Sequence, residues 1–177
     1  DPLWSRGLGD VYKRQARKCF FSFHYVPDNW RASTIRQIGA IEGNQPALDN
    51  DWETVTKGGD AAIQKWIDSQ MEGRTCAVIL IGENTAKRKW IDYEIKKAWK
   101  NGMGVLGIHI HGIKNSAGNT SLKGSNPFAH LSLGDKVFSS VVKVYDPQGL
   151  DSKAKYNYIS DNIDAWIEEA IKIRKSN

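Results

Sequence analysis

Residues 88–95, which read RKWIDYEI, carry the side chains best suited to chemistry in this sequence. Trp90 and Glu94 are four residues apart, so on a helix they share one face, one turn from each other. An acid beside a large aromatic wall can position a carboxylate against a ribose. The structural alternative is that Glu94 pairs with Lys97 on a solvated face and that Trp90 belongs to the core. Spacing alone leaves both interpretations open, because structural networks also perturb acids.

Two histidines and two glycine-rich stretches are weaker candidates. The two-residue period of a strand places His109 and His111 on one face, but no Cys, Asp or Glu cluster offers further metal ligands, so we expect a polar strand end and no metal. Residues 102–107 match G-x-G-x-x-G, yet they follow a helix and enter a strand, the reverse of a dinucleotide-binding turn. Gly58-Gly59-Asp60 could bind phosphate, but no Walker Lys-Ser/Thr follows, which favours simple helix capping by Asp60.

Alternating strands and helices must position these residues. Short apolar runs predict the strands, and the run at 75–81 (TCAVILI) is apolar on both faces, as a central parallel strand requires. The predicted strands lie near 18–24, 75–81, 104–110 and 138–145, with a weak one near residue 47. Long polar loops are expected at 42–59 and 112–135.

Helical spacing predicts the elements between and after these strands. Asp28 or Asn29 is expected to cap the first helix, whose apolar stripe would be Trp30, Ile35 and Ile38. Asp60 would cap the second helix. Thr85 would cap the third, over 86–101, and its packing side chains would be Ile91, Ile95 and Ala98. A closing amphipathic helix is marked by Ile159, Ile163, Trp166, Ile167, Ala170 and Ile171.

This alternation predicts an α/β fold, a flavodoxin-like parallel sheet of about five strands with helices on both faces. Ligands of such sheets bind beyond the carboxyl ends of the strands. Those ends are His24-Tyr25, Gly82-Glu83 and residues 109–112.

Composition narrows the class of protein. The 177 residues carry 25 basic and 20 acidic side chains spread along the chain, a mild net charge of +5 that argues against a nucleic-acid binder and suits a small anion. No apolar run approaches the ~20 residues that cross a bilayer. Two cysteines, Cys19 and Cys76, indicate free buried thiols in a reducing, cytoplasmic compartment.

The first fifteen residues are expected to be a non-native, disordered tail. Residues 5–15 (SRGLGDVYKRQ) match the translation of a transposase adapter used for sequencing libraries, which indicates a metagenomic origin. Residues 16–177 are then expected to form one domain.

The chain from Arg17 onward resembles the bacterial TIR-like domain family, and most closely the TIR-like (ThsB) subunit of the Thoeris antiphage defence system. The resemblance is carried by a joint pattern of short motifs. They are CFFSFHY at 19–25 with Asp28 and Trp30-Arg31, Trp52-Glu53, GDAAI at 59–63, VILIG at 78–82, RKW at 88–90, YEI at 93–95, GIHIH at 107–111 and NPF at 126–128.

The resemblance implies a TIR fold that cleaves NAD at the nicotinamide–ribose bond and makes a cyclic ADP-ribose isomer. NAD would be a substrate, with no cofactor, and the product would activate a separate effector protein. Glu94, in a Trp-x-x-x-Glu helix, carries over as the catalytic residue. The expected substrate-binding residues are Ser22, His24, Tyr25, Arg31, Trp90 and Tyr93. Residues 42–59 would take the place of the loop that gates TIR sites.

Two other functions stay open. Many TIR domains are assembly modules without catalysis, so a non-catalytic assembly or interaction module is one alternative. A homo-oligomer is compatible with either function. A nucleoside deoxyribosyltransferase-like enzyme shares the fold and a helix carboxylate, and it would turn over nucleosides that lack the pyrophosphate. For the catalytic interpretation, an acid at a cleft rim should contribute little to the core, so Glu94→Gln should hardly change stability.

Overall fold

A computed structural model of the chain describes residues 17–38, 41–43 and 57–177. The predicted tail at 1–15 and the weak strand predicted near residue 47 lie outside these described residues.

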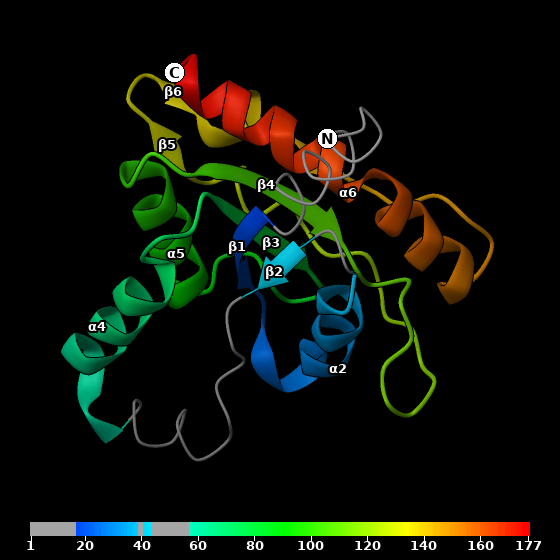
Figure 1. Ribbon diagram of the computed structural model, residues 1–177. Coiled ribbons are helices and arrows are strands. Elements are labelled where there is room, and N and C mark those ends of the chain that lie inside the picture. The colour runs from blue at the N-terminus through cyan, green and yellow to red at the C-terminus, as the bar shows by residue number, and fades with distance from the viewer. Residues whose placement is uncertain (1–16, 39–40, 44–56) are drawn as a thin grey trace, which may run out of the picture.

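The centre of the structure is a parallel sheet whose strand order is β2-β1-β3-β4-β7 (Figure 1). Every neighbouring pair in this sheet is parallel. The order corresponds to 2-1-3-4-5 along the chain, which is the flavodoxin-like arrangement. The predicted fold class is therefore confirmed. The strands are β1 Arg17–Ser22, β2 Ile41–Gly43, β3 Cys76–Ile81, β4 Gly104–His109 and β7 Val144–Tyr145.

In the described part of the chain, four helices cover the two faces of the sheet (Figure 1). Helices α2 (Tyr25–Arg36) and α6 (Ser152–Lys175) pack on one face, and α4 (Gly59–Met71) and α5 (Lys89–Lys100) pack on the other. Parallel neighbours need long crossovers, and helices on both faces are the usual solution. None of the helices in the described part of the chain is long and apolar enough to cross a membrane.

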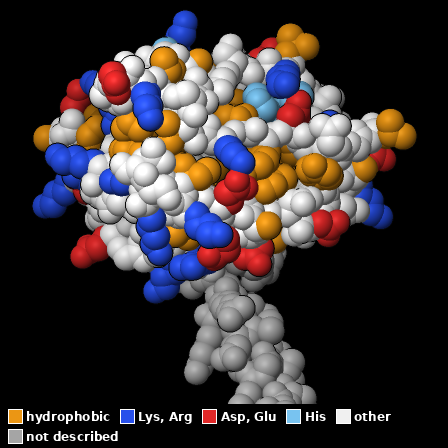
Figure 2. Space-filling model, turned by 90° about the horizontal axis from the view of Figure 1, so that it is seen from above, with side chains coloured by type: hydrophobic (Ala, Val, Ile, Leu, Met, Phe, Trp, Pro, Cys, Tyr) orange, Lys and Arg blue, Asp and Glu red, His pale blue; other side chains and the backbone are white. Residues whose placement is uncertain are grey.

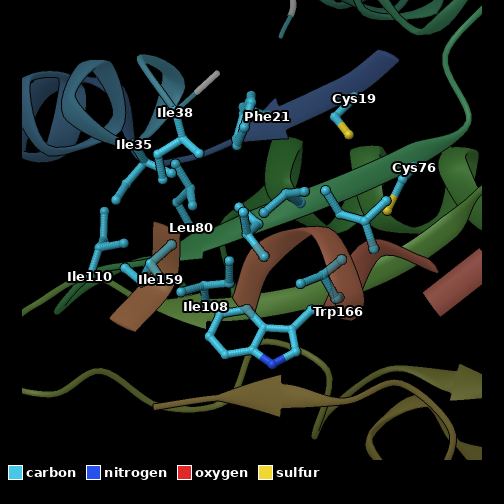
Figure 3. Close-up of a cluster of buried hydrophobic side chains, with 14 of the residues drawn as sticks. Cys19, Phe21, Ile35, Ile38, Cys76, Leu80, Ile108, Ile110, Ile159 and Trp166 are labelled. Atoms are coloured by element: carbon cyan, nitrogen blue, oxygen red, sulfur yellow. The ribbon is translucent and has the colours of Figure 1, made fainter. Parts of the chain in front are cut away.

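Strand β3 shows why the sheet has two cores. Its side chains alternate between the two faces with the period of two that a strand imposes. Cys76, Val78 and Leu80 belong to the α2/α6 core, while Ala77 and Ile79 belong to the α4/α5 core. Figure 3 shows the first core, where Leu80 and Ile108 face the side chains of Ile159 and Trp166 from α6.

The two cysteines lie side by side in this core. Cys19 and Cys76 are register partners on the neighbouring strands β1 and β3, and both are free and fully buried (Figure 3). The prediction of buried free thiols is confirmed.

The predicted start of α2 was wrong by several residues. The helix begins at Tyr25 with His24 as its N-cap, and Pro27 fits within the first turn, where its missing N–H has no helical acceptor. Asp28 does not cap the helix, because its buried carboxylate pairs with Arg31. Trp30 is 54% exposed and does not join the apolar stripe.

The predicted caps of α4 and α5 also need correction. Gly58 is the N-cap of α4, and Asp60 lies in its first turn. Helix α5 begins at Lys89 with Arg88 as its N-cap. Thr85 is instead fully buried in the preceding turn, where its Oγ1 accepts a hydrogen bond from the N–H of Gly82 over 2.8 Å. The packing residues predicted for α5 are confirmed, since Ile91, Ile95 and Ala98 are buried.

The predicted strand over 138–145 exists only at its end. Residues Phe138–Ser140 form a 3-10 turn, and only Val144–Tyr145 pairs with β4. Val141 and Val142 are neighbours in the chain and both contact the α4/α5 core, whereas a strand would turn neighbouring side chains to opposite faces. Phe138 packs edge-on against Trp99, with ring centroids 5.4 Å apart. Before this turn, β5 (Ser132–Leu133) and β6 (Lys136–Val137) form a short antiparallel pair.

Basic and acidic side chains are interspersed on the face shown in Figure 2. This mixing fits the mild net charge of +5.

Candidate active site

A cleft of about 370 Å³ opens at the carboxyl end of β1, between the first turn of α2 and the N-terminal end of α5. Its walls are residues 23–26 from the first side and residues 87–91 with Glu94 from the second. The volume falls within the range of small-molecule sites, roughly 300–1,000 Å³. The position is the one that parallel-sheet geometry predicts for a ligand.

Glu94 is the only carboxylate that lines this cleft within the described residues. Ser22, the last residue of β1, is buried and points toward α5, so its Oγ donates a hydrogen bond to Glu94 Oε2. Burial raises the pKa of Glu94 to about 8, and the Ser22 hydrogen bond opposes that rise. The carboxyl is therefore mostly protonated at neutral pH unless a positive charge comes near it. Lys97 was the partner of Glu94 considered from the sequence, but its Nζ lies 3.9 Å from Asp68 Oδ2.

Aromatic rings form the walls beside Glu94. Trp90 lines the cleft one turn before Glu94 and also packs against the α4/α5 core. The ring therefore serves both as a wall of the cleft and as part of the core, the two roles considered from the sequence. Lys89 Nζ lies 4.9 Å from the centroid of the Trp90 ring. On the other wall, Phe23 and Tyr25 stack with their ring centroids 6.1 Å apart.

The rim of the cleft is basic. Lys87, Arg88 and Lys89 follow one another where the chain enters α5. Lys89 forms an ion pair with Asp60 of α4. The pKa of His24, across the cleft, is lowered by burial and by the nearby positive charge of Arg88. His24 Nδ1 is buried, and no hydrogen-bond partner is found for it among the residues that the structure describes.

Five of the seven predicted site residues come together here. His24, Tyr25, Trp90 and Glu94 line the cleft, and Ser22 reaches it through its hydrogen bond to Glu94.

Arg31 does not line the cleft. It is 3% exposed, and its Nη1 lies 2.9 Å from Asp28 Oδ1. Its Nε donates to the carbonyl of Ile113 over 2.6 Å, and its Nη2 donates to the carbonyl of Asn119 over 2.9 Å. Arg31 therefore fixes the start of the 112–135 loop to α2.

Tyr93 also points away from the cleft. Its hydroxyl donates to Asp68 Oδ1 of α4 over 2.8 Å, and burial raises its pKa to about 12. The edge of its ring packs on Trp90, with centroids 5.7 Å apart. Its position supports Trp90 and joins α5 to α4.

The end of β3 is filled by protein atoms. A Cβ on Gly82 would lie 2.0 Å from Asp28 Oδ2, and a Cβ on Gly124 would lie 2.0 Å from the Gly82 carbonyl oxygen. Glycine is required at both positions because the 112–135 loop and α2 close over this strand end. The predicted strand end at Gly82-Glu83 therefore does not line the cleft.

The two histidines at the end of β4 are a separate feature. The ring centroids of His109 and His111 lie 5.7 Å apart. Burial lowers the pKa of His109 to about 4. Within residues 17–38, 41–43 and 57–177, no group of three or more His, Cys, Asp or Glu residues could hold a metal ion.

Comparison with known proteins identifies the family. The profile of the Thoeris protein ThsB, TIR-like domain, matches residues 20–115, more than half of the chain. The chain belongs to the Thoeris ThsB TIR-like domain family. A Bacillus cereus (strain MSX-D12) protein named "Putative cyclic ADP-D-ribose synthase ThsB1" is 35% identical over 121 residues, which cover 66% of this chain and 63% of that protein. The chain thus spans less than two thirds of the length of this relative.

The part that matches the ThsB family contains the whole cleft. Residues 23–26, residues 87–91 and Glu94 all lie within 20–115, as does Ser22. Sequence reasoning did not assign the basic rim to the site, although Arg88 and Lys89 directly precede Trp90. Their position just before a helix that follows a strand end was the available signal.

Proposed function

We propose that this chain cleaves the nicotinamide–ribose bond of NAD and closes the ADP-ribose part into a cyclic product. The observation that carries the proposal is the Glu94 carboxyl inside a cleft, with Trp90 beside it. Membership of the ThsB family and the name of the Bacillus cereus relative, a cyclic ADP-D-ribose synthase, support it. The cyclic product would be a diffusible signal in antiphage defence, read by a separate effector protein.

The chemistry requires little from the protein besides one negative charge. Nicotinamide leaves as a neutral group from a pyridinium, so no general acid has to protonate it. The ribose that remains develops oxocarbenium character at its anomeric carbon. A carboxylate placed in advance near that carbon or its hydroxyls stabilises this charge.

The raised pKa of Glu94 fits a cationic substrate. Without a cation nearby, burial favours the protonated carboxyl, with a pKa of about 8. The positive nicotinamide ring would favour the ionised form, because opposite charges lower the pKa of an acid. Substrate binding would then release a proton to solvent and leave the carboxylate charged only when the reacting ring is present.

The aromatic walls would keep water from the reacting carbon. Trp90 and Tyr25 present flat apolar surfaces on opposite sides of the cleft, where rings of the substrate can stack. Cyclisation requires an internal hydroxyl to react before water does, so exclusion of water decides between a cyclic product and simple hydrolysis. NAD is a substrate in this scheme, and no cofactor takes part.

Release of nicotinamide from NAD tests the proposal. The wild type, Glu94→Gln and the control Glu83→Gln should be compared, as purified and with an extract of phage-infected cells. Glu83 is exposed and lies outside the cleft, so its variant should match the wild type. Glu94→Gln should release nicotinamide at least about 10²-fold more slowly. Equal rates for the wild type and Glu94→Gln, or no release by the wild type in either condition, would contradict the proposal.

One observation supports the assembly module as a second candidate. Val26, which also lines the cleft, and Trp30, one turn later on α2, are 84% and 54% exposed. Exposed apolar side chains of this size favour a protein contact. If this patch mediates self-association, Trp30→Ser should lower the mass measured by light scattering without changing nicotinamide release.

A further inference from the structure

The charges on the cleft do not balance. Among the described residues, its lining carries three cations, Lys87, Arg88 and Lys89, against the single carboxyl of Glu94. That carboxyl is mostly neutral at neutral pH, since its pKa is about 8. The cleft therefore presents a positive rim above an acid that does not offset it.

Two of the three cations have no counterion among the described residues. Lys89 is held between Asp60 and the Trp90 ring. Lys87 and Arg88 are exposed, and no hydrogen-bond or ion-pair partner is found for the side chain of either among residues 17–38, 41–43 and 57–177. Arg88 is close enough to His24 to lower the pKa of that residue, so its charge extends across the cleft toward the β1 wall.

Two local features disfavour these cations at the start of α5. Cations at the N-terminal end of a helix are disfavoured by the helix dipole, whose positive end lies there. In addition, the φ angle of Lys87 is +66°, the only positive φ of a non-glycine residue in the described part of the chain. That left-handed conformation is unfavourable for any residue that carries a Cβ. An anionic ligand between Lys87 and Arg88 would offset the electrostatic cost.

We propose that Lys87 and Arg88 bind the pyrophosphate of a dinucleotide and thereby select it over nucleosides. This inference deepens the proposed function and rests on it for the identity of the reacting end. A guanidinium presents several N–H donors in one plane, which matches two neighbouring phosphate oxygens, and the lysine adds a mobile charge. With the pyrophosphate at this rim, the adjoining ribose extends between Trp90 and Tyr25 toward Glu94.

Cations at the mouth of the cleft also distinguish two enzyme classes that share a helix carboxylate. A nucleoside deoxyribosyltransferase acts on substrates without a pyrophosphate, so it has no use for two unpaired cations at the mouth of the cleft. For a dinucleotide-cleaving enzyme the same two residues set the specificity.

Binding of ADP-ribose measured by calorimetry tests the subsite without turnover, because this probe has the pyrophosphate and lacks nicotinamide. The variant is Lys87→Asn with Arg88→Gln, since asparagine tolerates a positive φ and both changes remove charge. The matched control is Lys96→Gln, which removes an exposed lysine of α5 that does not line the cleft. Thermal melts verify that each variant is folded, and Arg88→Lys provides a variant that keeps the charge.

The double variant should raise the Kd for ADP-ribose about 30- to 100-fold, as expected for two lost charge-assisted contacts. Arg88→Lys should lose less, Lys96→Gln should match the wild type, and added salt should weaken the wild type more than the double variant. Equal Kd values for the wild type and the double variant, or no binding of ADP-ribose by the wild type, would overturn the subsite even if NAD is cleaved. If the double variant alone binds weakly but nicotinamide is never released from NAD, the subsite stands and the proposed function falls.

Discussion

Replacement of Glu94 by Gln should stabilise the protein increasingly as the pH rises, although it should abolish turnover. The side chain is held inside the cleft by Ser22, and burial raises its pKa from an ordinary 4.5 to about 8. Between these two values the folded protein keeps a proton that the unfolded chain releases. Stability of the wild type therefore falls as the pH rises through this window, and it is constant again above about pH 8. Glutamine has nearly the same shape and has no proton to lose.

The magnitude follows from the width of that window. Each pH unit corresponds to about 1.4 kcal/mol, so the full shift amounts to at most about 5 kcal/mol between pH 4.5 and pH 8. Relaxation around the charged carboxyl reduces this value, and about 3 kcal/mol is a reasonable expectation. For a chain of 177 residues that corresponds to a difference in Tm of about 10 °C at pH 8.5, with little difference at pH 5.

The assay is urea denaturation of the wild type, Glu94→Gln and the exposed control Glu83→Gln at pH 5, 6, 7 and 8.5. The difference in unfolding free energy between Glu94→Gln and the wild type should increase with pH, whereas the control should show no trend. A constant offset for Glu94→Gln would refute the claim that this half-buried carboxyl is desolvated and protonated in the folded protein. This expectation differs from the sequence-based one, in which an acid at the cleft rim hardly affects stability, and the assay decides between them.

Three further changes test how the site is supported. Ser22→Ala removes the hydrogen bond that lowers the pKa of Glu94, so the pH at which kcat/KM for NAD reaches half of its maximum should move upward in a pH–rate profile. Gly82→Ala places a Cβ 2.0 Å from Asp28 Oδ2, and thermal melts should show a loss of about 1–3 kcal/mol; an unchanged Tm would contradict the close packing. Arg31→Met leaves the buried Asp28 carboxylate unpaired and should cost about 3–5 kcal/mol in urea denaturation, while adding Asp28→Asn should recover part of that loss. A double variant no more stable than Arg31→Met would count against the pairing.

The sequence predicted the central strands well because their signal is local. The apolar runs at β3 and β4 end within one residue of the predicted limits, since a strand buried on both faces must be apolar throughout. The prediction of a strand over 138–145 was wrong for its first part. Phe138 and Val142 are apolar because they pack into the core beside Trp99, not because they lie in the sheet. Apolar character alone does not distinguish a buried turn from a buried strand.

The site was predictable where it depended on spacing and not where it depended on distant partners. Glu94 and Trp90 could be found because they match the Trp-x-x-x-Glu helix of the TIR-like family and because parallel-sheet geometry places a ligand at the nearby strand end. Arg31 and Tyr93 were misplaced because their directions are set by Asp28 and by Asp68 on α4, contacts that the spacing of residues does not encode. The basic rim was missed because unpaired cations at a cleft resemble ordinary solvated charges in the sequence.

The most direct test of the central claim is the mass spectrum of the products after incubation with NAD. The wild type should yield nicotinamide together with an ion of the mass of a cyclic ADP-ribose, one water lighter than ADP-ribose. Glu94→Gln, verified as folded at the assay pH, should leave NAD intact over the same time. Both results follow from the role of the Glu94 carboxyl in the cleft. The same products at the same rate from both proteins, or intact NAD with the wild type in the presence of an extract of phage-infected cells, would contradict it.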